Sequence, residues 1–279
     1  MNTSRPLALG ALTVLGMTPP DIVSLAAECG YDYAGLRLLP ATPGGIAHPL
    51  MHDRKMLDET LARIRDTGVG IFDLEIVRID AQFDSKAMLP FLETGAELGA
   101  QCILVAGDDP DLGRFSDNFA AFCDAAAPFG LKPNLEFMPW TRVPDLGTAL
   151  EILAAIDRDN AGLLIDAIHF GRSASRLDDL GRIPARWLQY AQICDAPVQT
   201  PPTTEEIIRA AREERLLPGD GGLPLAELFR RLPRALPLCV EVPNSALGSD
   251  AERARRALAA TRTCSRKTSN RQPLRRHEA

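Results

Sequence analysis

The chain has 279 residues, of which 46% are hydrophobic and 24% charged, and its formal net charge is −6. These values exclude a largely disordered chain, a collagen-like repeat and a disulfide-rich miniprotein, and they fit one large α/β domain or two small domains. The six cysteines lie within apolar helix or strand patterns and form no Cys-x-x-Cys pair. We expect them to be reduced and buried, as in a cytoplasmic protein.

The charge is unevenly distributed along the chain. Residues 262–279 contain six lysines and arginines and one acid, so residues 1–261 carry a net charge of −11. Nucleic-acid binding depends on clustered positive charge that faces phosphates, and the acidic body argues against such a surface. Because residues 262–279 also lack apolar periodicity, we expect one domain over residues 1–261 followed by a basic, flexible tail.

The apolar stretch from Leu7 to Met17 has the length of a signal-peptide core. No small-x-small cleavage site follows it, and Thr18-Pro19-Pro20-Asp21 is typical of a helix start. We therefore interpret the apolar stretch as a buried strand. No run reaches the roughly 18 apolar residues that a membrane span needs, so we expect no membrane segment.

Taken in chain order, short β-branched or leucine-rich runs alternate with amphipathic segments, which is the signature of parallel βα units. The predicted strands are Ala8–Gly16, Tyr33–Leu38, Gly70–Ile79, Gln101–Gly107, Pro133–Met138, Gly162–His169, Trp187–Cys194 and Leu238–Pro243. The predicted helices are Pro20–Cys29, Lys55–Thr67, Met88–Leu98, Asp117–Phe129, Leu146–Ile156, Leu177–Leu180, Thr204–Glu213 and Asp250–Thr261, with a further turn at Leu225–Leu232.

Eight such units without a linker or a composition shift before residue 262 predict a single-domain (β/α)8 TIM barrel. The continuous apolar run Leu163-Leu164-Ile165 is typical of a strand that is covered on both faces, as barrel strands are. The main alternative is a doubly wound open sheet. Against that alternative, no glycine-rich phosphate loop follows the first predicted strand.

Predicted strands five to eight each end in an acid or an amide inside an otherwise apolar run. These residues are Glu136, Asp166, Gln192 and Glu241. The active site of a (β/α)8 barrel lies at this end of the strands. A carboxylate flanked by apolar residues is costly to bury unless it is paired, protonated or bound to a cation. A single such acid could be a satisfied core residue, but three acids and one amide at successive strand ends outline a divalent-metal site.

These residues resemble those of a known family, the sugar phosphate isomerase/epimerase group of xylose isomerase-like TIM barrels, over roughly residues 5–260. The group includes ketose 3-epimerases, hydroxypyruvate isomerase, inosose dehydratase and dehydroshikimate dehydratase. Its members typically hold a divalent metal through Glu, Asp, His and Glu from strands five to eight. The resemblance implies that Glu136, Asp166, Gln192 and Glu241 are the counterparts of these ligands.

Gln192 departs from the family pattern, because many members have histidine at this position. An amide oxygen is a harder and weaker ligand than imidazole, so the predicted ligand set contains only oxygen. Such a set favours Mn²⁺ or Mg²⁺ over Zn²⁺. The same substitution leaves open a non-catalytic binding barrel that has lost its metal.

The resemblance also implies substrate-binding residues. The spacing Asp166-x-x-His169 matches a histidine that contacts substrate, and the run from Arg215 to Gly221 resembles a loop whose arginine binds the substrate's oxygens. His169 could instead be a core histidine that is hydrogen-bonded to the backbone.

Three further side chains are candidates for the pocket. Arg37 and Glu75 follow predicted strands two and three, and they form either a pocket pair or a structural salt bridge. Trp140 either caps the pocket or packs against its wall.

The chemistry implied by the resemblance begins with a hydroxyketone bound to the cation. The polarised carbonyl acidifies the neighbouring C–H and stabilises an enediolate. In ketose 3-epimerases the glutamates that correspond to Glu136 and Glu241 exchange protons with the substrate, one on each face. We therefore expect a metal-dependent isomerase or epimerase of carbohydrate metabolism that acts on a keto-sugar or a sugar phosphate. A dehydratase of the same family, acting on inosose or dehydroshikimate, begins with the same proton abstraction, and the sequence does not separate the two.

Other functions and partners receive less support. Endonuclease IV shares the barrel, but its zinc ions require many histidines, and this chain has four histidines and an acidic body. We expect a small carbohydrate substrate, with neither nucleic acid nor membrane as a partner. Family members often form dimers or tetramers, which implies a homo-oligomer, although no exposed apolar stripe identifies an interface.

Overall fold

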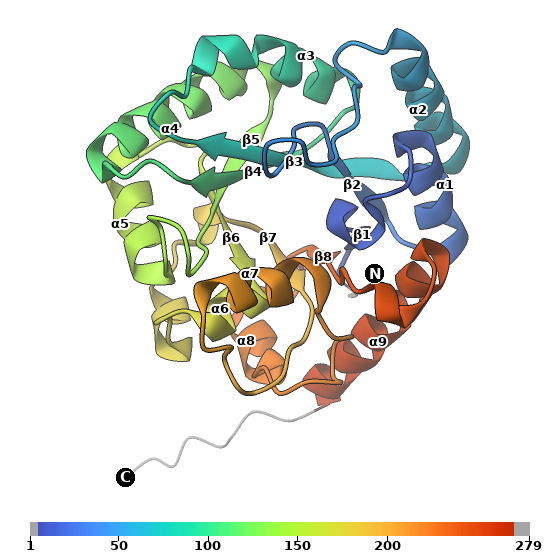
Figure 1. The fold of residues 1–279 in the computed structure, drawn as a ribbon, viewed down its shortest axis with the longest axis vertical. Helices are drawn as coiled ribbons and strands as arrows, with labels where there is room; N and C mark the ends of the chain where they lie inside the picture. Colours follow the sequence, from blue (N-terminus) through green and yellow to red (C-terminus); the bar gives the residue numbers. More distant parts are fainter. Residues whose placement is uncertain (1–4, 271–279) are drawn as a thin grey trace.

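Eight parallel strands close into one barrel in the chain order β1 to β8, and helices cover its outside (Figure 1). The computed structural model describes residues 5–270. The strands are β1 (Leu7–Leu9), β2 (Tyr33–Arg37), β3 (Gly70–Ile79), β4 (Cys102–Gly107), β5 (Lys132–Glu136), β6 (Gly162–Asp166), β7 (Leu188–Ile193) and β8 (Leu238–Val240). The pairing of β1 with β8 closes the barrel and places Ala8 opposite Cys239. The prediction of a single-domain (β/α)8 TIM barrel is confirmed.

Each strand is followed by helical structure. The α-helices are α1 (Pro19–Cys29), α2 (Arg54–Thr67), α3 (Leu89–Glu97), α4 (Leu112–Ala126), α5 (Leu146–Ile156), α6 (Ala167–Arg172), α7 (Thr204–Glu213), α8 (Leu225–Arg231) and α9 (Asp250–Asn270). The short 3-10 helices are η1 (Ala11–Val14), η2 (Ser85–Met88), η3 (Ala127–Phe129), η4 (Leu177–Arg182), η5 (Ala185–Trp187) and η6 (Ser245–Leu247). Within residues 5–270, no helix has both the length and the hydropathy that crossing a membrane requires.

The first strand is much shorter than the sequence predicts. β1 ends at Leu9, and the predicted strand Ala8–Gly16 is wrong beyond that point, because η1 begins at Ala11. Gly10 lies where the chain leaves β1 and passes closely over β8. A Cβ atom at this position would lie 3.0 Å from the sulfur of Cys239 and 3.2 Å from the Cβ of Glu241. The turn therefore needs a residue without a side chain.

The sixth strand is also shorter than predicted. It ends at Asp166 rather than His169, because the Asp166 side chain accepts hydrogen bonds from the backbone N–H of Ile168 (2.7 Å) and of His169 (3.4 Å). An aspartate in this position caps a helix. Helix α6 begins at once and carries His169, whereas the helix predicted at Leu177–Leu180 forms the 3-10 helix η4.

The last helix is longer than predicted. The sequence predicts an end at Thr261, but α9 continues to Asn270. Arg262, directly after Thr261, donates Nη2 to the backbone oxygen of Gly30 at 2.8 Å and so holds this part of the helix against the turn after α1. Nine residues assigned to the basic tail thus continue the helix, while residues 271–279 lie outside the described residues.

Segments from both ends of the chain hold the strand β8. Thr13 in η1 donates its hydroxyl to the backbone oxygen of Val240 (3.0 Å) and accepts a bond from the N–H of Val242 (2.9 Å). Arg253 of α9 donates Nε to the backbone oxygen of Thr13 (2.7 Å). The backbone on both sides of Glu241 is therefore fixed by one buried threonine.

Apolar side chains form two layers. The larger lies between the strands and the helices, and a smaller cluster fills the barrel. The smaller cluster comprises Ala8, Phe72, Ile76, Cys102, Leu104, Ala106, Met138, Leu164, Tyr190 and Cys239. Cys102, Cys123, Cys194 and Cys239 are buried, as predicted, whereas Cys29 and Cys264 are half-buried. The filled barrel interior leaves its carboxyl end for a binding site.

Candidate active site

The four predicted metal ligands lie at the carboxyl end of the barrel. Glu136 and Asp166 are the last residues of β5 and β6, Gln192 is the penultimate residue of β7, and Glu241 directly follows β8. The pairing of β6 with β7 sets Asp166 opposite Gln192. All four side chains are buried, with at most 3% of each residue exposed. Three carboxyl groups thus share one region from which water is largely excluded.

Glu136 and Asp166 form a compact group with His169. Each of the three side chains offers one ligand atom, and these atoms lie within 4.8 Å of one another. The Nε2 atom of His169 is 3.7 Å from Oε1 of Glu136. The short strand β6 and its capped helix bring this histidine to the group. The three residues can hold a metal ion.

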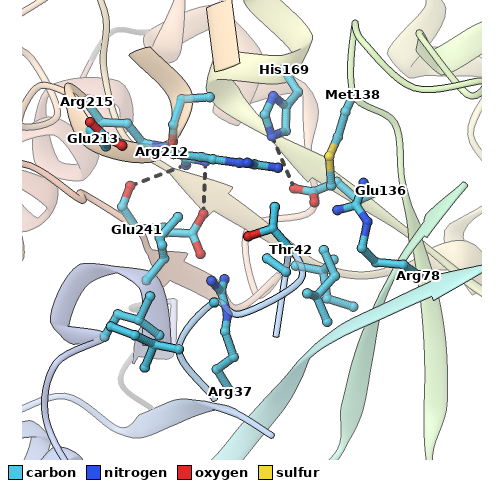
Figure 2. A pocket seen from close by; sticks show the side chains of 18 of the residues that line it. Arg37, Thr42, Arg78, Glu136, Met138, His169, Arg212, Glu213, Arg215 and Glu241 are labelled. Atoms are coloured by element: carbon cyan, nitrogen blue, oxygen red, sulfur yellow. Dashed lines mark hydrogen bonds and ion pairs between the residues drawn. The ribbon is translucent and has the colours of Figure 1, made fainter. Parts of the chain in front are cut away.

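Arg215 lies between Asp166 and Glu241. Its Nη1 donates to Oδ2 of Asp166 at 2.6 Å. Its Nη2 lies 3.0 Å from Oε2 of Glu241 (Figure 2). The backbone oxygen of Ala211 accepts Nε at 2.6 Å and fixes the guanidinium. The positively charged guanidinium of Arg215 therefore links two of the predicted ligands, Asp166 and Glu241.

Gln192 contacts only one of the other predicted ligands. Its Nε2 donates to Oε1 of Glu241 at 3.2 Å, while its Oε1 has no hydrogen-bond partner among the residues that the structure describes. An amide oxygen that is buried without a partner costs free energy unless a ligand satisfies it. This oxygen is the ligand atom that the sequence predicts for a cation.

Burial and crowding of like charges control the titration of the acids. Burial, followed by the charges of Asp166 and Glu241, raises the pKa of Glu136 well above its usual value. Burial also raises the pKa of Glu241, although the charge of Arg215 acts in the opposite direction. Burial alone would raise the pKa of Asp166 as well, but its contacts with Arg215 prevail and lower it.

His169 is neutral at physiological pH, because burial lowers its pKa to about 4. Its ring contacts Trp140 edge to face, with ring centroids 5.0 Å apart and an interplanar angle of 83°. Over the described range 5–270, neither Nδ1 of His169 nor Nε1 of Trp140 has a hydrogen-bond partner. Both atoms remain available to a bound ligand.

Arg37 and Glu75 form a buried ion pair at 2.5 Å. Arg37 lines the pocket at the carboxyl end of the barrel, whereas Glu75 does not. Nε of Arg37 and Oε1 of Glu75 have no hydrogen-bond partner in the described part of the chain. The two residues are thus a salt bridge, and Arg37 is the member of the pair that reaches the pocket.

A cavity of about 350 Å³ lies against these side chains (Figure 2). Its lining includes six of the nine residues predicted for the site, namely Arg37, Glu136, Trp140, His169, Arg215 and Glu241. Asp166, Gln192 and Glu75 are not in the lining. The volume is that of a small-molecule site.

The lining also contains two arginines that the sequence analysis missed. Arg78 is the penultimate residue of β3, and Arg212 lies on α7, three residues before Arg215. Applying the strand-end criterion to β3 would have found Arg78. An arginine within a polar helix such as α7 carries no comparable signal.

The residues present fit a divalent cation. Among the residues that the structure describes, ten buried side-chain polar atoms have no hydrogen-bond partner, and half of them belong to predicted site residues. These five atoms are Nε of Arg37, Oε1 of Glu75, Nε1 of Trp140, Nδ1 of His169 and Oε1 of Gln192. The buried carboxylates and the unpaired amide oxygen supply hard ligand atoms, and within residues 5–270 Arg215 is the one arginine or lysine that pairs with this acidic group.

The chain belongs to the xylose isomerase-like TIM barrel family, whose model matches residues 23–264. This match confirms the resemblance seen in the sequence. An inosose isomerase from Halalkalibacterium halodurans is 32% identical over 110 residues, which is 38% of this chain and 36% of that protein. The matched stretch thus spans only about a third of the curated relative.

Solved structures share the whole barrel. The IOLI protein with a bound zinc atom superimposes with a TM-score of 0.76 at 21% identity and covers 95% of this chain and 100% of its own. The 3-keto-D-glucoside 4-epimerase of E. coli gives a TM-score of 0.70 at 18% identity, covering 94% of this chain and 100% of its own. At these identities the likeness establishes the fold.

Proposed function

We propose that the chain is a metal-dependent isomerase or epimerase that acts on a small polyhydroxy ketone, either a keto-sugar or a sugar phosphate. The names of the inosose isomerases and of the sugar epimerase that shares the fold support this class of reaction. The observation that carries the proposal is the buried group of Glu136, Asp166 and His169 beside a cavity of small-molecule size.

A divalent cation would be held by Glu136, Asp166, Gln192 and Glu241, with His169 within reach of the first two. The bound cation would supply the positive charge that acidifies the C–H beside the substrate's carbonyl. A bound cation would explain why several acids are buried together. Without one, only the charge of Arg215 and protonation offset the free-energy cost of burying them.

Glu136 and Glu241 are the groups that exchange protons with the substrate. Burial raises the pKa of each glutamate, which makes its carboxylate a better acceptor for a proton from the substrate's carbon. Arg215 fixes the orientation of Glu241 through the contact at 3.0 Å. Neutral His169, steadied by Trp140, offers Nδ1 to a substrate hydroxyl.

The experiment that tests this function measures exchange of carbon-bound hydrogen with solvent. The protein, loaded with Mn²⁺ or Mg²⁺, is incubated in D₂O with keto-sugars, hydroxypyruvate, inososes and dehydroshikimate. We expect at least one compound to incorporate deuterium beside its carbonyl and to change configuration or isomerise. Loss of water with the appearance of an absorbing enone would instead identify a dehydratase, and the absence of exchange in every compound would overturn the proposal.

Removal of the metal gives a second test. We expect a chelator to abolish activity, and Mn²⁺ or Mg²⁺ to restore it better than Zn²⁺, because the predicted ligands supply oxygen. Gln192→His adds an imidazole and should shift the preference toward Zn²⁺. The measurements are turnover and the metal-dependent rise in melting temperature for each ion. A preference for Zn²⁺ in the unaltered protein would show that Gln192 does not set the choice of metal.

A further inference from the structure

Four arginines line the cavity beside the acidic group. They are Arg37, Arg78, Arg212 and Arg215 (Figure 2). A neutral polyhydroxy ketone needs hydrogen-bond donors but does not need several full positive charges. What these four guanidinium groups can bind depends on which of them are already paired with a carboxylate.

Three of these arginines are neutralised by a carboxylate. The pairs are Arg37 with Glu75 at 2.5 Å, Arg78 with Asp108 at 2.5 Å and Arg215 with Asp166 at 2.6 Å. Arg212 differs from them, since its guanidinium makes neither a hydrogen bond nor an ion pair with any residue in the described part of the chain, 5–270. It is half-buried on α7 and lines the same cavity as Glu136 and His169.

The charges around Arg212 are predominantly positive. Burial first lowers its pKa, and the charges of Arg78 and Arg37 lower it further. Those of Asp108 and Glu213 act in the opposite direction but more weakly. A guanidinium that is partly removed from water, faces two other cations and has no counter-ion is unfavourable unless an anion joins it.

We propose that Arg212, the cavity arginine without a paired carboxylate among the described residues, is a subsite for an anionic group on the substrate, either a carboxylate or a phosphate ester. The inference rests on the proposed function in that it takes this cavity as the substrate site. It narrows the substrate from any polyhydroxy ketone to one that carries a negative charge. Arg212 supplies the direct hydrogen bonds, because Arg78 already binds Asp108 through two nitrogens.

Three small hydroxyketones test the subsite, because they differ in one end group. Dihydroxyacetone is neutral, dihydroxyacetone phosphate carries a phosphate ester, and hydroxypyruvate carries a carboxylate. Dissociation constants are measured by calorimetry on the metal-loaded protein at constant ionic strength. We expect at least one anionic probe to bind about tenfold or more tightly than dihydroxyacetone, and the better of the two identifies the group recognised.

Variants separate the arginine from the metal as the source of this preference. Arg212→Gln should weaken the preferred anionic probe by about tenfold or more and leave dihydroxyacetone unchanged. Arg209→Gln removes the same charge one turn earlier on α7, where Arg209 is exposed and pairs with Glu214 at 3.0 Å. This control should change each dissociation constant by less than about twofold, as expected for an exposed charge.

Three results would overturn the subsite. The first is equal affinity of the unaltered protein for neutral and anionic probes. The second is an unchanged affinity of Arg212→Gln for the anionic probes. The third is a loss of affinity in Arg209→Gln as large as that in Arg212→Gln. The test needs no turnover, so failure of the solvent-exchange experiment would reject the proposed reaction without rejecting the subsite. Conversely, loss of the subsite would leave exchange on neutral ketones intact.

Discussion

We expect Glu241→Gln to lower turnover by at least about a hundredfold while the barrel remains folded. A glutamine has nearly the same shape as glutamate but cannot exchange a proton with the substrate, and general acid–base groups contribute about 10² to 10⁴ in rate. Asp166 keeps its contact with Arg215, so the guanidinium retains a counter-ion. The measurements are turnover, solvent deuterium exchange and the melting temperature.

Two comparisons make this result specific. Glu136→Gln should remove exchange at the other face of the substrate, so the two variants should differ in which stereoisomer still exchanges. Glu213→Gln is the matched control, because Glu213 is exposed and lines the same cavity. Turnover by Glu241→Gln at the rate of the unaltered protein would show that Glu241 moves no proton.

The second large effect concerns stability. Arg215→Met should lower the free energy of unfolding of the metal-free protein by about 3–5 kcal/mol, because it leaves Asp166 and Glu241 buried without their counter-ion. Added Mn²⁺ or Mg²⁺ should raise the stability of this variant more than that of the unaltered protein, since the cation replaces the missing charge. Denaturant unfolding with and without metal measures both effects.

The control for this variant is Arg209→Met, which breaks the exposed pair with Glu214. We expect it to change the free energy of unfolding by no more than about 1 kcal/mol, with the same response to metal as the unaltered protein. If metal-free Arg215→Met were as stable as the unaltered protein, the carboxylates would have to be protonated and Arg215 would not hold them.

The alternation of apolar runs predicts the barrel because each βα unit buries one strand and one helix face. The bounds of β3, α5 and α7 agree with the sequence prediction. Two of the errors fall where polar contacts override periodicity. Asp166 caps α6 and ends its strand, and Asp111 caps α4, which begins at Leu112, five residues before the predicted start at Asp117. Interpreting each of these aspartates as a helix N-cap would have predicted where α4 and α6 begin.

Part of the candidate site is also visible in the sequence. An acid inside an apolar strand run is conspicuous, so Glu136, Asp166 and Glu241 can be found without coordinates. The bridge made by Arg215 cannot, because its partners lie 49 and 26 residues away along the chain. Whether an arginine on α7 faces solvent or the cavity likewise depends on how the helix packs over the barrel.

The hydrogen bonds that join Thr13 to β8 and to Arg253 affect when the pocket can form during synthesis. Thr13 is synthesised well before its partners Val240, Val242 and Arg253, which lie 227 to 240 residues further along the chain. The backbone around Glu241 becomes fixed only when these segments meet. A nascent chain with its first six strands in place would still lack an ordered pocket. The protein therefore becomes able to bind a ligand only when the barrel closes.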